Sequence, residues 1–148
     1  YKGVVYQTHG VANNDFLRIC GKDCVGTLLP VGPVQMARQL PDSNPVKKSA
    51  LAYVEKYEAA NGKGSVSSFG AYAWDAGVLL NASVPAALKK AKPGTPEFRA
   101  ALRDGLEAVK EVAGATGIYS MSASDHLGLD QRSRVMIEIR NGEWSLLK

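Results

Sequence analysis

The chain has 148 residues, of which 45% are hydrophobic and 22% charged, and its formal net charge is +4 at pH 7. This length and composition are typical of about one folded domain with a sizeable core. The basic residues are scattered among acidic ones, which argues against nucleic-acid binding, and the longest apolar stretch, residues 76–88, is too short and too polar to insert into a membrane.

The N-terminal part of the chain predicts two strands around a short helix. Residues 3–7 (GVVYQ) are rich in β-branched and aromatic side chains and predict a buried strand. The polar side chains of residues 13–15 can cap a short helix over residues 15–20, and Gly21 suits its left-handed end. Residues 26–31 (GTLLPV) predict a second strand, and prolines mark its end.

A crossing loop over residues 33–43 leads into the first of three predicted helices. Asn44 can cap this helix, Pro45 fits its first position, and Gly62 ends it. The apolar residues on one face follow the 3.6-residue period: Val46, Ala50, Tyr53, Val54 and Tyr57.

The second and third helices are predicted over residues 65–91 and 95–112. The second is apolar nearly all round between residues 72 and 80, which predicts a central, buried helix, and Pro85 can kink or divide it. The third opens with Thr95 as cap and Pro96 at its first position. Its predicted apolar face comprises Phe98, Leu102, Leu106, Val109 and Ala113.

The C-terminal part returns to strands. Residues 117–122 predict a strand, residues 123–133 a polar turn region, and residues 134–147 a hairpin around Asn141-Gly142. Strands at both ends with three helices between them indicate an α/β fold in which the first and last strands share a sheet. Because the chain begins at Tyr1, directly in a strand-like run, we expect it to be a fragment of a longer protein.

The residues able to carry chemistry form no catalytic motif. Cys20 and Cys24 can form a disulfide or remain two reduced thiols, and a zinc site that joins them to His9 and His126 lacks the paired spacing of known zinc motifs. The segment DHLGLD, residues 125–130, favours a turn in which aspartates bond to nearby amides over a metal site. The aromatic residues Tyr53, Tyr72 and Trp74 favour core positions over a ligand box.

Several segments, in order, resemble one protein family. They are HGVANNDFLRICGKDCVGTLLPVGP (residues 9–33), FGAYAWDAGVLLNA (69–82), GTPEFRAALRDGLE (94–107) and DHLGLD…VMIEIRNGEW (125–144). Together they resemble the C-terminal portion of branched-chain-amino-acid-type periplasmic solute-binding proteins, the receptors of ABC importers. The resemblance implies part of a type I fold, in which two α/β lobes close over a ligand by a hinge motion.

The resemblance also implies a division of the chain between lobes. Residues 1–29 and 134–148 correspond to part of the second, C-terminal lobe. Residues 30–133 correspond to hinge crossings and to the C-terminal half of the first lobe, with helices 44–113 flanked by strands at both ends. The helices would lack the sheet that covers them in an intact receptor, so we expect this fragment to self-associate or to pack its helices differently.

Two residues correspond to ligand contacts of the family. By this resemblance, His9 corresponds to a cleft position at which the amino-acid-binding members have a glutamate that pairs with the ligand's ammonium group. Phe69 corresponds to an aromatic residue that contacts the ligand's side chain. An imidazole cannot supply the anion that an ammonium group needs. The resemblance therefore implies a small organic solute as the ligand. An aromatic or aliphatic carboxylate or an amide is favoured over an amino acid, and backbone amides at the nearby helix N-terminus would help to bind it.

The remaining expectations follow from the same resemblance. It implies a non-catalytic, periplasmic receptor without cofactor or metal, whose partners are the solute and the membrane permease of the importer. A ligand-sensing regulatory domain of the same fold is the alternative.

A small metal-dependent hydrolase that uses His9, Asp125, His126 and the cysteines is a third hypothesis, which metal analysis would test.

Overall fold

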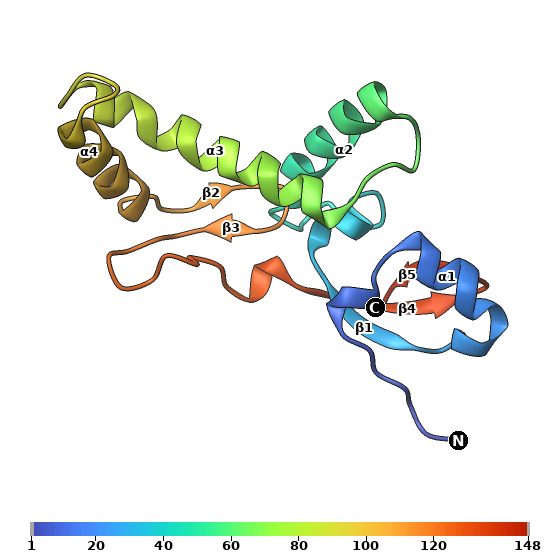
Figure 1. Cartoon of the computed structure of the whole chain (residues 1–148). Coiled ribbons are helices and arrows are strands. Elements are labelled where there is room, and N and C mark those ends of the chain that lie inside the picture. Colours follow the sequence, from blue (N-terminus) through green and yellow to red (C-terminus); the bar gives the residue numbers. More distant parts are fainter. Residues whose placement is uncertain (1, 148) are drawn as a thin grey trace.

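The computed structural model describes residues 2–147, which form two parts (Figure 1). One part is a small antiparallel sheet in the order β1-β4-β5, made of β1 (Leu28–Val31), β4 (Val135–Arg140) and β5 (Glu143–Leu146). The other part holds the three long helices and a short hairpin. The chain leaves the sheet after Val31 and returns at Val135, and these two residues face each other in the strand register. Two crossings between the parts therefore lie side by side.

Alternating apolar side chains explain the sheet. Leu29, Val31 and Ile137 point to one face and are fully or almost fully buried, together with Met36 and Leu40 of the segment that follows β1. The turn between β4 and β5 is the predicted Asn141-Gly142 pair, with φ of +53° and +78°. Both residues lie in the left-handed region that a tight two-residue hairpin requires, so this part of the sequence prediction is confirmed.

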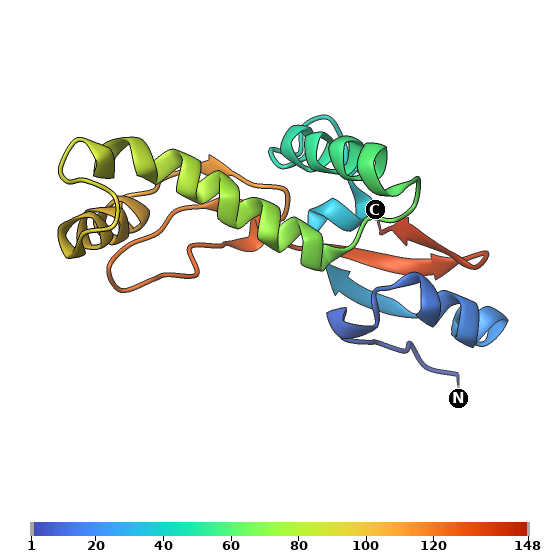
Figure 2. The same cartoon turned by 45° about the horizontal axis from the view of Figure 1, so that its top comes forward.

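The short helix α1 (Asn14–Cys20) lies beside this sheet (Figure 2). The side chain of Asn13 caps it by accepting a hydrogen bond from the backbone amide of Phe16 at 2.9 Å. Gly21 ends it with φ of +52°. Phe16 stacks on Trp144 of β5, with ring centroids 6.4 Å apart, which fixes the helix against the sheet.

The predicted strand over residues 3–7 is wrong in one respect. These residues are extended, but they are exposed, Tyr6 by 65%, and they form a single parallel bridge, from Tyr6 to Leu28. The amide of Gln7 donates to the Leu28 carbonyl at 2.8 Å, so the segment lies along the free edge of β1. It stays exposed because no other strand among residues 2–147 covers its outer side.

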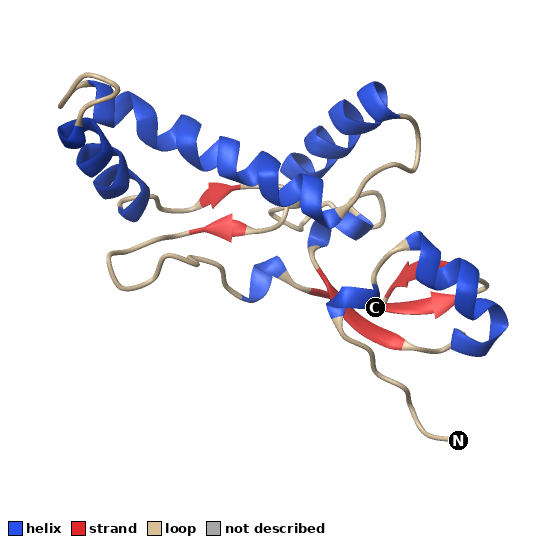
Figure 3. Ribbon diagram, viewed as in Figure 1, coloured by secondary structure: helices blue, strands red, loops and turns tan. Residues whose placement is uncertain are grey.

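The three long helices are α2 (Lys47–Asn61), α3 (Ser68–Leu88) and α4 (Pro96–Glu107) (Figure 3). Thr95 caps α4 by accepting from the Phe98 amide at 3.1 Å, as predicted. The helix α2 begins slightly later than predicted, because residues 44–46 form a turn in which the Asn44 side chain accepts from the Val46 amide. Its apolar face is confirmed, with Ala50, Tyr53 and Val54 buried.

The prediction that α3 is buried all round is wrong. Only one face of the helix is buried, and the buried residues are Ser68, Ala71, Asp75, Leu79, Ser83 and Ala87. The opposite face lacks a partner among the described residues, so Phe69, Tyr72, Leu80 and Leu88 are exposed. Pro85 neither ends nor divides the helix, because the carbonyl that loses its partner belongs to Asn81, an exposed residue that water can reach.

A short hairpin of β2 (Val112–Ala113) and β3 (Ile118–Tyr119) lies alongside α3 (Figure 1). The predicted strand over residues 117–122 is thus shorter than expected. Beyond it, residues 120–130 form the polar turn region, and a short 3-10 helix over Gln131–Ser133 leads back to β4. Among residues 2–147, none of the helices combines the length and the hydropathy that a transmembrane segment requires.

Candidate functional site

His9 and the start of α3 meet at the junction between the two parts. Ser67 caps α3 through its side-chain oxygen, which places Ser68 as the first residue of the helix. The Nε2 atom of His9 lies 3.5 Å from the Oγ atom of Ser68, at the long limit of a hydrogen bond. Fifty-nine residues separate these two side chains in sequence. The fold therefore brings the predicted ligand residue His9 next to the helix that carries Phe69.

His9 and Phe69 line one cavity of about 130 Å³, which we call the His9–Phe69 cavity. Its other lining residues are Gly10, Ala12, Asn13, Ser68 and Tyr72. Phe69 is 84% exposed and meets Tyr72 edge to face, with ring centroids 6.4 Å apart. Two aromatic rings on one open wall are a surface on which the apolar part of a ligand can pack.

A second cavity, of about 240 Å³, adjoins the first at His9 and Tyr72. We call it the crossing cavity, because it lies where the two crossings pass between the sheet and the helices. Its other lining residues are Pro30, Val31, Gly32, Thr116, Leu129, Ser133 and Arg134. His9 and Tyr72 thus line both cavities, and the two cavities together are the candidate site.

Apart from Tyr72, the ionisable side chains that line this site are all basic. His9 and Arg134 line it, whereas no aspartate or glutamate among residues 2–147 does. The side-chain oxygen of Asn13 is occupied by its capping bond to the Phe16 amide. This cap also occupies the Phe16 amide, one of the amides at the start of α1 that the sequence prediction offered to a ligand. Among residues 2–147, the lining of the two cavities therefore offers one permanent positive charge, that of Arg134, beside polar and aromatic groups.

A buried carboxylate holds one wall of the crossing cavity. Asp75 of α3 is 1% exposed and accepts hydrogen bonds from the backbone amides of Ala115 and Thr116, at 2.5 and 2.9 Å. The Tyr119 hydroxyl donates to the same carboxylate at 3.1 Å. Only glycine fits at position 114, because a Cβ atom there would lie 2.6 Å from Asp75. Burial raises the pKa of Tyr119 to about 12.

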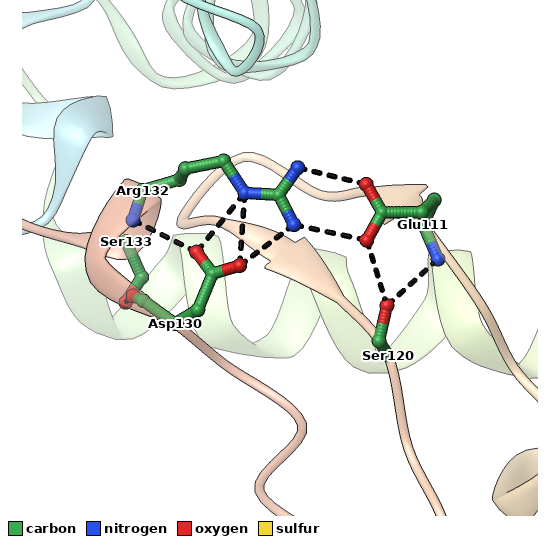
Figure 4. Close-up of polar contacts among 5 residues, drawn as sticks. All are labelled: Glu111, Ser120, Asp130, Arg132 and Ser133. Carbon is green, nitrogen blue, oxygen red and sulfur yellow. Dashed lines mark hydrogen bonds and ion pairs between the residues drawn. The ribbon is translucent and has the colours of Figure 1, made fainter.

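A cluster of charged side chains holds the segment before β4 (Figure 4). Arg132 donates to both carboxylate oxygens of Glu111, at 2.7 and 2.9 Å, and its Nη2 atom donates to Asp130 at 2.7 Å. Ser120 donates to Glu111 at 2.9 Å. Hydrogen bonds from Arg132 hold the pKa values of Glu111 and Asp130 below their usual range. The cluster ties the hairpin end to the crossing segment that carries Arg134.

The other chemical candidates lie away from this site. Cys20 and Cys24 form a disulfide with Cα atoms 5.6 Å apart. His126 contacts Glu107, 3.1 Å from Nε2 to Oε1, at an apolar cavity of about 430 Å³ between α3 and α4. Asp125 accepts from the amides of residues 127 and 128, which confirms the predicted turn. Among residues 2–147, no three acidic, histidine or cysteine side chains lie together as a metal site.

Sequence reasoning missed several residues of the site, among them Ser68, Tyr72, Thr116 and Arg134. Tyr72 was predicted to be a core aromatic, yet its position three residues after Phe69 places both on one helix face, a signal that could have found it. Tyr53 is buried as predicted, and Trp74 is partly buried against it. Arg134 has no signal in the sequence, because its role at the site depends on the crossing geometry.

Solved structures of other proteins share this architecture. An extracellular ligand-binding receptor from Rhodopseudomonas palustris HaA2 is 42% identical, with a TM-score of 0.92 over 100% of this chain and 42% of that chain. A protein from R. palustris strain CGA009 is 44% identical, with a TM-score of 0.91 over 100% of this chain and 42% of that one. No protein-family model and no curated protein matches the chain.

A more distant structure shares the fold. A leucine-binding protein from Thermotoga maritima is 21% identical, with a TM-score of 0.67 over 100% of this chain and 37% of that one. The described chain thus spans about two fifths of the proteins it matches. Because it keeps the arrangement found in the R. palustris structures, the expectation that its helices pack differently is wrong.

Proposed function

Because this chain belongs with the extracellular ligand-binding receptors of the type I periplasmic-binding-protein fold, we propose that it forms part of a non-catalytic solute receptor of an ABC importer. Such a receptor acts outside the cytoplasm and delivers a small organic solute to a membrane permease. The observation that carries the proposal is the shared cavity of His9 and Phe69 at the crossings. The disulfide between Cys20 and Cys24 fits an oxidising compartment.

The ligand of this receptor is a small organic solute bound between the two lobes by hinge closure. His9 and Phe69 are its proposed contacts in this chain, His9 at the polar end and Phe69 along the apolar body. The absence of a carboxylate from the lining residues in the described range favours an aromatic or aliphatic carboxylate or an amide over an amino acid. Residues 1–29 and 134–148 then belong to the second lobe, and residues 30–133 to the crossings and the first lobe.

A ligand-sensing regulatory domain is the alternative function of the same fold. The two functions share the site, so only the partner distinguishes them. A transport receptor stimulates ATP hydrolysis by its permease complex when its ligand is present, whereas a sensor domain does not.

Calorimetric titration of the full-length receptor tests the proposal. The ligands are benzoate, hexanoate, their amides and leucine, and the variants are His9→Ala and Phe69→Ala. We expect each variant to lose about tenfold or more in affinity for the solute, because a central contact that the ligand shields from water carries much of the binding energy. The matched control is Phe98→Ala on α4, which lines neither cavity and should bind as the wild type does. Equal binding by all four proteins would contradict the assignment of the site.

We further propose that the isolated 148-residue chain self-associates. The exposed face of α3 and the apolar cavity lined by Leu79, Leu80, Leu106 and Met121 would gain from being covered. Light scattering at micromolar concentration tests this directly: a dimer or larger species is expected, and a cooperative monomer would contradict it.

A further inference from the structure

We propose that the crossing cavity is the anion-binding end of the ligand site and that Arg134 contacts the carboxylate of the solute. This inference rests on the proposed function and deepens it, because it names the ligand's charge and the residue that reads it. Arg134 lines the cavity together with His9, Thr116 and Ser133. The cavity walls thus combine one permanent positive charge with polar side chains.

The charge of Arg134 is available to a ligand. Other arginines that line cavities are paired with a neighbouring acidic residue. Arg103, for example, forms an ion pair with Asp104 at 2.6 Å. Arg134, by contrast, makes no ion pair or side-chain hydrogen bond with any residue in the range 2–147. Its neighbour Arg132 takes both nearby carboxylates, Glu111 and Asp130. Glu111 and Asp130 are therefore already paired with Arg132, and Arg134 has no acidic partner among residues 2–147.

The polar group beside Arg134 suits the same assignment. Thr116 uses its hydroxyl hydrogen to donate to Asp75 at 2.5 Å, so the position of this wall is fixed before a ligand arrives. A fixed wall lowers the ordering cost of binding. Asp75 itself is satisfied by the hairpin and is not exposed to the cavity.

The rest of the lining describes the body of the ligand. The crossing cavity has apolar walls formed by Pro30, Val31 and Leu129. Tyr72 lines both this cavity and the His9–Phe69 cavity. A solute with its carboxylate at Arg134 can therefore extend an apolar or aromatic body past Tyr72. The chemical class that fits is an organic monocarboxylate.

The position of Arg134 also relates binding to closure. It lies between the 3-10 helix Gln131–Ser133 and β4, directly before the residue that pairs with Val31 across the two crossings. A carboxylate held there contacts the crossing itself. We expect ligand charge, and not only ligand shape, to stabilise the closed form.

Titration of the full-length receptor with matched acids and amides tests the inference. Benzoate and benzamide share a shape and differ in charge, as do hexanoate and hexanamide. We expect Arg134→Gln to weaken binding of the acid by about tenfold or more, with less than a twofold change for the amide. Arg134→Lys should recover part of the loss. Arg140→Gln, at the far end of β4 and outside both cavities, should bind as the wild type does.

The outcomes separate this inference from the proposed function. Acid binding that Arg134→Gln leaves unchanged, or a receptor that binds the amide at least as tightly as the acid, would overturn the role of Arg134 and leave the receptor function standing. If none of the acids, amides or leucine binds, the proposed function fails, and this inference fails with it. Circular dichroism of each variant verifies that the change in binding is not a loss of folding.

Discussion

Asp75 accepts two hydrogen bonds from Thr116, one from its backbone amide at 2.9 Å and one from its hydroxyl at 2.5 Å. Asp75 lies on the buried face of α3, and Thr116 lines the crossing cavity 41 residues later. The long helix thereby fixes the hairpin that forms one wall of the candidate site. Loss of the contact between Asp75 and Thr116 would consequently also change the shape of the site.

Substitution of Asp75 should destabilise the protein. Asp75→Asn replaces an acceptor with a donor that faces the amides of Ala115 and Thr116, and a buried group without a partner costs about 1–3 kcal/mol. We expect the free energy of unfolding to fall by about 2–4 kcal/mol in urea titrations followed by circular dichroism. The matched control is Asp23→Asn, an exposed aspartate, for which little change is expected. Equal stability of the two variants would contradict the structural role of Asp75.

Tyr119 should make the protein sensitive to alkali. Its pKa of about 12 in the folded state lies above the ordinary value of 10.0, so the folded state holds this proton more tightly. The resulting stability is fully present below pH 10 and is lost as the pH rises through 12. Tyr119→Phe should therefore lose less stability than the wild type between pH 10 and 12, measured by urea unfolding at each pH. Parallel curves would show that Tyr119 titrates normally.

The Arg132 cluster should stabilise the crossing segment in an acid-sensitive way. The pKa values of Glu111 and Asp130 are lowered in the folded state, so their contribution is present above pH 4.5 and is lost as the pH falls through the folded values. Arg132→Gln should speed amide exchange in residues 111–120 at pH 6, with a smaller difference near pH 3. The control Arg18→Gln breaks only a pair within α1, to Asp15, and should leave that exchange unchanged.

The disulfide should contribute modestly to stability. Cys20 and Cys24 are only four residues apart, and closing so short a loop is worth about 2 kcal/mol in the chain-entropy estimate. The double variant Cys20→Ser with Cys24→Ser should unfold at lower urea concentration by that amount, and α1 should be the helix affected. Intact mass measured before and after alkylation tests whether the thiols are bonded. Two alkylated cysteines in the unreduced native protein would contradict the bond.

Local signals in the sequence predicted most elements of the fold. The Asn13 and Thr95 caps and the Asn141-Gly142 turn act within a few residues, so their chemistry is visible in sequence. The burial of α3 could not be predicted in this way. An all-round apolar pattern indicates that partners exist but not that they lie among the described residues, and Phe69 remains exposed for this reason.

The candidate site was predicted in part. The resemblance to a receptor family supplied His9 and Phe69, and the fold places both in one cavity. Arg134 and Thr116 could not be found from sequence, because they reach the site only through the strand pairing at Val31 and Val135 and through the buried bond to Asp75. Long-range contacts of this kind leave no local pattern.

The central claim is that His9 causes this site to prefer solutes that lack an ammonium group. Calorimetric titration of the full-length receptor and its His9→Glu variant with benzoate and with leucine tests it most directly. The account predicts that the wild type binds benzoate in preference to leucine and that His9→Glu weakens benzoate binding by about tenfold or more, since a carboxylate then faces a carboxylate. Tight binding of leucine by the wild type would contradict it.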